Sequence, residues 1–231
     1  GETCAGIYSV VGSVTIRGED TVVTADGGSY IKDGYTYRYD GIYADDDILI
    51  EDGAEVTATG DGGGICAYDG SVTISGGAVV IADGGSNIED GYTYYYDGIY
   101  AYDDILIEDG AEVTATGDGG GIFADDGSVT ISGGAVVTAT GETYPGIEAS
   151  GSVTISGDAV VTATGEQGYG ISAYGSVTIR GEGTVVTAAG GSEIYEDYTD
   201  YYDGIYAEED ILITDGAEVT ATGDGYGIAC G

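Results

Sequence analysis

Carboxylates are the chemically active side chains that this chain holds in the greatest number. The sequence has 42 Asp and Glu residues against four Lys and Arg residues, a formal net charge of −38. Several Asp residues are neighbours just before an apolar run, and closely spaced hard oxygen ligands suit Ca²⁺. The candidate calcium ligands are Asp45, Asp46, Asp103, Asp104, Asp125 and Asp126. The chain has no EF-hand loop and no Gly-Gly-x-Gly-x-Asp nonapeptide, so a solubilising acidic surface is the competing interpretation, and no other cofactor is expected.

The same residues argue against catalysis. The sequence has no His, so no Ser-His nucleophile pair can form. A glycosidase needs two carboxylates that converge on one bond, whereas these carboxylates recur with the repeat along the whole chain. We therefore expect a protein that is not an enzyme.

The charge also limits the partners. Nucleic-acid binding depends on basic contacts, and anionic membrane surfaces attract basic segments, so a chain of net charge −38 fits neither. The sequence has no apolar run long enough to span a bilayer. Cations and extracellular polysaccharide stay open as partners, and an extracellular or cell-surface location is expected.

Tyrosine is the second unusual residue type. The chain has 22 Tyr residues, many of them in three extensions near residues 28–40, 85–97 and 191–203. Tyr supplies a large, fairly rigid ring and a hydroxyl, which suits protein interfaces and sugar stacking. Either the rings pack over a corner of the fold, or they form an exposed contact surface. The candidate surface consists of Tyr35, Tyr37, Tyr39, Tyr92, Tyr94, Tyr96, Tyr198, Tyr201 and Tyr202.

A short repeat must position these groups. The pair Gly-Ile recurs from Gly6 to Gly227 in steps of 35, 23, 34, 23, 25, 24, 34 and 23 residues. Within a unit the apolar residues alternate with Thr, Glu or Ser, which is the period of a strand with one buried face. The expected inward set of one unit is Ile42, Ala44, Ile48, Ile50, Ala54, Val56 and Ala58. The expected ladder across units is Ile42, Ile65, Ile99, Ile122, Ile147, Ile171 and Ile205.

This pattern predicts an all-β fold, a right-handed parallel β-helix that forms a single domain over residues 1–231. A unit this short must stack on its neighbours to bury a core, and parallel crossovers are right-handed. We expect about eight coils of three short strands, with the Tyr-rich loop extensions on coils one, three and seven.

The units at residues 70–77 and 137–141 resemble the β-helical repeats of large bacterial surface and secreted proteins. Some of those proteins are labelled carbohydrate-binding or adhesin-like. The resemblance implies a prokaryotic, extracellular setting and carries over no binding residue, because the motif is structural.

The two ends suggest self-assembly. Residues 5–8 and 227–230 carry the same strand of the repeat, so one copy would continue another without a break in phase. Uncapped sheet edges template further pairing, and a head-to-tail contact generates a filament. Coil one holds most of the basic residues and coil eight is acidic. The residues expected at this joint are Cys4, Ala5, Gly6, Ile7, Tyr8, Arg17, Lys32, Arg38, Glu208, Glu209, Gly227, Ile228, Ala229 and Cys230.

Cysteine usage fits the same interpretation. An odd number of Cys residues in an extracellular chain suggests intermolecular pairing or a free thiol. Cys4 and Cys230 would bridge neighbouring copies, whereas Cys66 occupies an outward slot. The competing interpretation is a fragment of a longer repeat protein.

The sequence thus predicts a structural subunit of an extracellular filament that polymerises with itself, head to tail. The alternative is an adhesin or a carbohydrate-binding stalk of a bacterial surface protein. A lesser alternative is ice binding, because Thr57-x-Thr59 and its counterparts resemble the Thr-x-Thr arrays of insect ice-binding solenoids.

Overall fold

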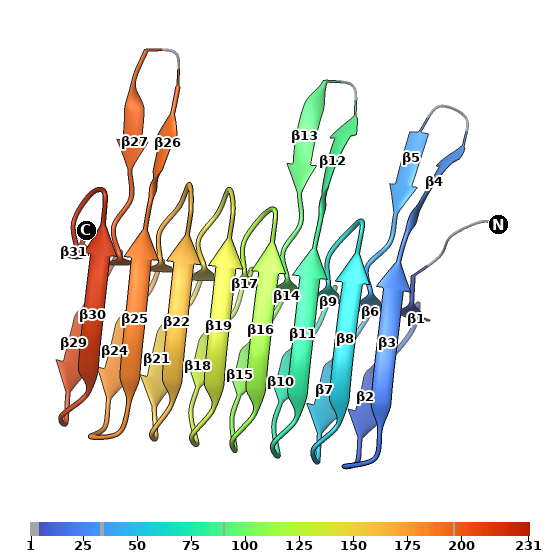
Figure 1. The fold of residues 1–231 in the computed structure, drawn as a ribbon, viewed down its shortest axis with the longest axis horizontal. Coiled ribbons are helices and arrows are strands. Elements are labelled where there is room, and N and C mark those ends of the chain that lie inside the picture. Colours follow the sequence, from blue (N-terminus) through green and yellow to red (C-terminus); the bar gives the residue numbers. More distant parts are fainter. Residues whose placement is uncertain (1–4, 33–34, 90, 196) are drawn as a thin grey trace.

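The computed structural model describes residues 5–32, 35–89, 91–195 and 197–231. Every regular element over these residues is a β-strand, and three parallel sheets run the length of the rod (Figure 1). Sheet A has nine strands, and sheets B and C have eight each. The chain visits A, B and C in turn, so each circuit forms one coil. The fold is the expected right-handed parallel β-helix of about eight coils.

The strands are short and recur at the same positions of each coil. Sheet A contains β1 (Ile7–Ser9), β6 (Ile42–Ala44), β9 (Ile65–Ala67), β14 (Ile99–Ala101), β17 (Ile122–Ala124), β20 (Ile147–Ala149), β23 (Ile171–Ala173), β28 (Ile205–Ala207) and β31 (Ile228–Cys230). Sheet B contains β2 (Val14–Arg17), β7 (Ile48–Glu51), β10 (Val72–Ile74), β15 (Ile105–Ile107), β18 (Val129–Ile131), β21 (Val153–Ser156), β24 (Val177–Arg180) and β29 (Ile211–Thr214). Sheet C contains β3 (Val22–Gly27), β8 (Glu55–Gly60), β11 (Val79–Gly84), β16 (Glu112–Gly117), β19 (Val136–Gly141), β22 (Val160–Gly165), β25 (Val185–Gly190) and β30 (Glu218–Gly223).

Neighbouring coils pair in register, like residue on like residue. Ile99 pairs with Ile65 on one side and with Ile122 on the other. The expected Ile ladder is fully buried from Ile42 to Ile205, and the expected inward set of coil two is buried as well. Burial of an Ile side chain contributes about 1.5–3 kcal/mol, so this ladder and the Ala and Val columns beside it stabilise the rod.

The turns between sheets B and C need a backbone that few residues adopt. Asp52 and Gly53 both have positive φ, at 57° and 74°. Gly133 and Gly134 have positive φ at the equivalent turn three coils further along, at 62° and 74°. Gly has no Cβ to clash there, and Asp tolerates the left-handed region better than most residues. This requirement explains why Asp-Gly and Gly-Gly recur at these turns.

The three Tyr-rich extensions are two-stranded antiparallel hairpins rather than loops. They are β4 (Ser29–Lys32) with β5 (Tyr35–Arg38), β12 (Ser86–Glu89) with β13 (Tyr92–Tyr95), and β26 (Ser192–Ile194) with β27 (Thr199–Tyr201). Each hairpin leaves the end of a sheet C strand and leads into a sheet A strand, and all three project to the same side of the rod (Figure 1). None of the described segments is a helix of the length and apolar character needed to cross a membrane.

Candidate binding face

The outward face of sheet A carries a row of aromatic rings. The middle residue of each sheet A strand points away from the core, and these residues align in register from coil to coil. The aligned positions are Tyr8, Tyr43, Cys66, Tyr100, Phe123, Glu148, Ser172, Tyr206 and Ala229. Further Tyr residues from the turns flank this row, so the face concentrates aromatic surface.

Many of these rings contact one another. The centroids of Tyr8 and Tyr43 lie 4.8 Å apart, and those of Tyr100 and Phe123 lie 5.8 Å apart. Tyr43 also contacts Tyr68, which follows β9, at 6.1 Å. Such pairs add about 0.5–1.5 kcal/mol beyond burial of their area, so the rings hold one another in place.

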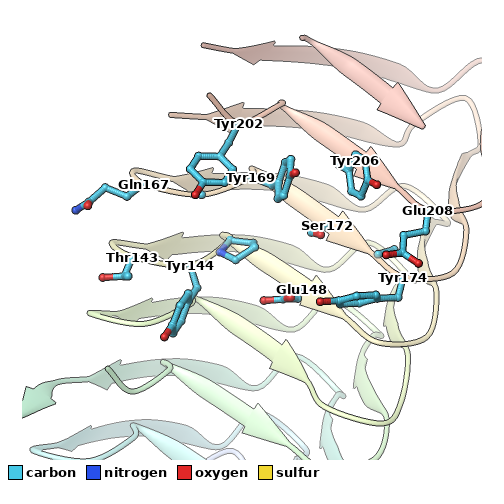
Figure 2. Close-up of a pocket in the computed structure, with 13 residues that line it drawn as sticks. Thr143, Tyr144, Glu148, Gln167, Tyr169, Ser172, Tyr174, Tyr202, Tyr206 and Glu208 are labelled. Atoms are coloured by element: carbon cyan, nitrogen blue, oxygen red, sulfur yellow. The ribbon is translucent and has the colours of Figure 1, made fainter. Parts of the chain in front are cut away.

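This face carries a cavity of about 330 Å³ over β20, β23 and β28, which we name the aromatic cleft. Figure 2 shows Tyr169 and Tyr206 at one side of it, Glu148 and Tyr174 at the other, and Ser172 between them. The residues that line the aromatic cleft are Thr143, Tyr144, Pro145, Glu148, Gln167, Gly168, Tyr169, Ser172, Ala173, Tyr174, Tyr202, Tyr206 and Glu208.

Tyr169 organises the aromatic wall. Its ring stacks on Tyr206 with centroids 5.0 Å apart and an interplanar angle of 18°. Tyr202, at the base of the third hairpin, meets the same ring edge-on at 5.1 Å and 79°. Tyr169, Tyr202 and Tyr206 come from three successive coils. Their contacts with one another make this side of the cleft aromatic and rigid.

The polar side of the aromatic cleft is acidic. Burial, and then the charge of Asp125, raise the pKa of Glu148. Glu208 is exposed at the rim, and Ser172 is buried on the floor. None of the described residues that line the cleft is Lys or Arg. The cleft thus offers acceptors and negative charge beside aromatic rings.

A second cavity of about 340 Å³ repeats this arrangement over β6, β9 and β14. Its aromatic rings are Tyr43, Tyr68, Tyr95, Tyr96 and Tyr100, and Asp40, Gly63, Cys66 and Asp97 complete the lining. Burial raises the pKa of the Cys66 thiol, so this sulfur is a poor nucleophile. The middle strands of the two cavities, β9 and β23, are four strand steps apart in sheet A, about 19 Å at the usual strand spacing.

Three Asp residues tie the hairpins to the next coil. Asp40 Oδ1 accepts a hydrogen bond from the N–H of Gly63 at 2.5 Å, and Asp97 Oδ1 accepts one from Gly120 at 2.6 Å. Asp203 makes the same contact with the N–H of Tyr226. Our sequence interpretation missed these carboxylates, although each occurs in an identical Tyr-Asp-Gly-Ile-Tyr-Ala segment after an extension.

The residues of the expected Tyr surface differ in exposure. Tyr37, Tyr92, Tyr94, Tyr198 and Tyr201 are exposed on the hairpins. Tyr39, Tyr96 and Tyr202 are instead half-buried, because they lie at the hairpin bases and pack against the coil. The side chain of Tyr35 lies outside the described residues. The aromatic cleft shares Tyr202 with this expected set and otherwise uses Tyr144, Tyr169, Tyr174 and Tyr206.

The acidic turns do not converge on one point. Over the described residues, no three His, Cys, Asp or Glu side chains form a group that could hold a metal ion. Asp104 Oδ1 accepts a hydrogen bond from the N–H of Ser128, and Asp125 Oδ2 accepts one from the Tyr100 hydroxyl. Asp45, Asp46, Asp103 and Asp126 lie in the same turns between sheets A and B. The calcium prediction therefore has no clustered ligand set behind it.

The residues expected at a polymer joint lie at opposite ends of the rod (Figure 1), apart from Cys4, which is outside the described residues. Arg17 forms an ion pair with Glu51 at 3.9 Å, and Lys32 lies on the first hairpin. Glu209 accepts a hydrogen bond from the Ser176 hydroxyl, and Cys230 is a free, exposed thiol. Arg17 and Glu209 are therefore held by contacts with an adjacent coil.

The two ends do not match strand for strand. Sheet A has nine strands because β1 and β31 both belong to it, whereas sheets B and C have eight. In a head-to-tail stack, a copy that places its β1 on β31 would leave sheets B and C one strand short at the joint. Head-to-tail stacking stays a prediction, and it would require one of these two terminal strands to move aside.

The Thr-x-Thr columns of sheet C align over part of the rod. Thr114 pairs with Thr138, which pairs with Thr162. Coil three interrupts the columns with Ile81 and Asp83. Ice binding stays a lesser prediction on this ground.

Comparison with known protein families finds a β-helix repeat in one segment of the chain. The sequence model of a family described as "Beta helix repeat" matches residues 153–176, which include β21, β22 and β23. Neither the curated proteins nor the solved structures give a match to the chain. Together with the stacked parallel strands, the match identifies the chain as a β-helical repeat region.

Proposed function

We propose that this β-helical repeat region is an adhesive rod at a cell surface that binds an extracellular polysaccharide along the tyrosine face of sheet A. It has no catalytic role in this proposal. The coils supply a straight, rigid support, and the rings supply stacking surfaces for sugar units.

The observation that carries the proposal is the pair of aromatic cavities on one face. Both are lined by Tyr rings together with carboxylates, and each is near the lower end of the volumes usual for small-ligand sites. Because they lie on the same sheet about 19 Å apart, one extended polymer can occupy both. Two linked sites raise the overall affinity well above that of either site alone.

The test is binding of polysaccharides to purified protein, measured by affinity electrophoresis and calorimetry. We expect Tyr169→Ala with Tyr206→Ala to weaken binding about tenfold, since loss of two stacking rings costs about 1.4 kcal/mol or more. Adding Tyr43→Ala and Tyr100→Ala should lower the affinity about a hundredfold in total, because the second site is then lost as well.

The matched control removes two exposed rings from the hairpins, Tyr92→Ala and Tyr201→Ala. This variant should bind like the wild type. If the hairpin variant loses binding and the sheet A variants keep it, the binding face is the hairpin row and the proposal is wrong.

A second candidate function is the head-to-tail filament, because the C-terminal end of the rod exposes apolar side chains that are buried in the interior coils. Ile228 on β31 is 44% exposed and Ile213 on β29 is 38% exposed, while their counterparts Ile205 and Ile179 in the interior are buried. A further coil would cover these side chains and pair with the open strand edges. That coil would come from a second copy or from the same polypeptide.

Light scattering and electron microscopy test the filament. If copies stack, wild-type protein should form high-order species, and Ile7→Lys with Ile228→Lys should abolish them. Burying an unpaired charge at the joint costs several kcal/mol. Val136→Lys with Val160→Lys, an equal charge change on the outward face of sheet C, is the control and should leave assembly intact. Monomeric wild-type protein at high concentration would rule out the filament.

A further inference from the structure

The aromatic cleft has negative charge with no cation near enough to balance it. Glu148 lines it from β20 and Glu208 from the turn after β28, and burial, followed by the charge of Asp125, raises the pKa of Glu148. The four basic residues of the chain lie elsewhere: three in coil one, and Arg180 at the end of β24 in sheet B. A neutral sugar would leave this charge unbalanced, whereas a cationic group would neutralise part of it.

The rings add a second attraction for a cation. Tyr144, Tyr169, Tyr174, Tyr202 and Tyr206 surround the cavity, and Figure 2 shows them on several sides of the space that Glu148 and Ser172 enter. The face of an aromatic ring attracts a nearby ammonium group, by about 0.5–2 kcal/mol depending on exposure. Aromatic walls and carboxylates together form a site for an organic ammonium.

We propose that the aromatic cleft binds the protonated amine of an amino sugar, so that the polysaccharide carries free amino groups. This inference rests on the proposed polysaccharide-binding function and names the ligand class. The ammonium would lie between Glu148 and Glu208, with its hydrogens donated to carboxylate oxygens and to the Ser172 hydroxyl. The sugar ring would stack against the Tyr169 and Tyr206 side.

The shape of the cleft favours an amino sugar over a lysine side chain. A cavity of about 330 Å³ exceeds what one alkyl ammonium fills, and ligand sites of this size hold a small cyclic molecule. The stacked ring pair of Tyr169 and Tyr206, with centroids 5.0 Å apart, provides a flat surface, which matches a sugar ring better than a flexible methylene stem. The repetition of the cavity further along the same face suits a polymer of like units.

Calorimetry with defined oligosaccharides tests the inference. The probes are tetramers of glucosamine, N-acetylglucosamine and glucose, which differ in the amine and share a similar ring. We expect the glucosamine tetramer to bind at least about tenfold more tightly than the other two, because a charge-assisted contact contributes about 1.5–3 kcal/mol. This preference should shrink as salt rises.

Two double variants separate the effect of the carboxylates in the aromatic cleft from the effect of the overall negative charge of the chain. Glu148→Gln with Glu208→Gln should reduce glucosamine-tetramer affinity about tenfold and bring it near that of the neutral tetramers. The control, Glu112→Gln with Glu218→Gln, removes the same charge from exposed positions on sheet C and should keep the preference. Circular dichroism spectra and melting curves show whether each variant keeps the fold.

The outcomes distinguish the inference from the function on which it rests. If all three tetramers bind equally and the Gln variant changes nothing, the face binds polysaccharide and the amine site is wrong. If no saccharide binds, the proposed function fails and the amine site fails with it. If an oligolysine peptide binds the cleft and glucosamine does not, the ligand is a basic protein segment and the inference is overturned.

Discussion

Gly121→Ala should destabilise the rod by about 3 kcal/mol, near the upper end of the usual cost of overpacking. A Cβ at Gly121 would lie 2.6 Å from the carbonyl oxygen of Gly146 and 2.6 Å from the backbone N of Thr140. Both atoms belong to the backbone of closely packed strands and turns, so neither can move without breaking the register. Urea denaturation followed by circular dichroism measures the change in the free energy of unfolding.

The control for Gly121 is another Gly of the same coil. Gly134 has positive φ, and a Cβ there would meet nothing within 4 Å. Asp158 occupies the equivalent place one coil later, also with positive φ. Gly134→Asn should therefore cost only about 0.5 kcal/mol. Equal losses for the two variants would mean that close packing at the Gly-Ile corner does not limit stability.

The fold was predictable because one pattern is repeated in every coil. The period of two placed Ile42 and its counterparts inside, and the recurrence of like residues fixed which strands pair. The hairpins were less evident. An Asp90-Gly91 pair between two runs of alternating residues is a hairpin signal, but the third extension has Glu196-Asp197 instead. The extensions were therefore interpreted as loops.

The aromatic cleft was harder to predict for a geometric reason. Its rings come from positions as far apart in sequence as Tyr144 and Tyr206, and several of them lie in turns. Register along a strand follows from the repeat, but the direction of a turn side chain depends on local backbone angles. The motif at residues 202–206 was a usable signal in the sequence. In each coil with an extension an Asp precedes the Gly-Ile pair, and the carboxylate of Asp203 accepts a hydrogen bond from a backbone N–H of the next coil.

Stability should fall as pH rises from about 4 to about 7, opposite to the usual behaviour of a salt-bridged carboxylate. Burial, opposed by the hydrogen bond from Gly120, raises the pKa of Asp97 from 3.8 to about 7. Burial likewise raises the pKa of Asp40 to about 6. The folded chain then holds protons that the unfolded chain has released, so the free energy of unfolding decreases with pH across this window. For Asp97 alone the change amounts to about 4 kcal/mol.

Asp97→Asn isolates this effect from the general repulsion of a highly acidic chain. The Asn side chain cannot ionise, and its Oδ1 can still accept the hydrogen bond that Gly120 donates to Asp97. We expect this variant to be more stable than the wild type at pH 8 and to show a flatter dependence on pH between 5 and 8. Asp61→Asn removes the same charge from an exposed side chain and should keep the wild-type slope. Urea midpoints at several pH values and constant ionic strength measure both. If Asp97→Asn and Asp61→Asn give the same slope as the wild type, the buried carboxyl of Asp97 does not couple folding to pH.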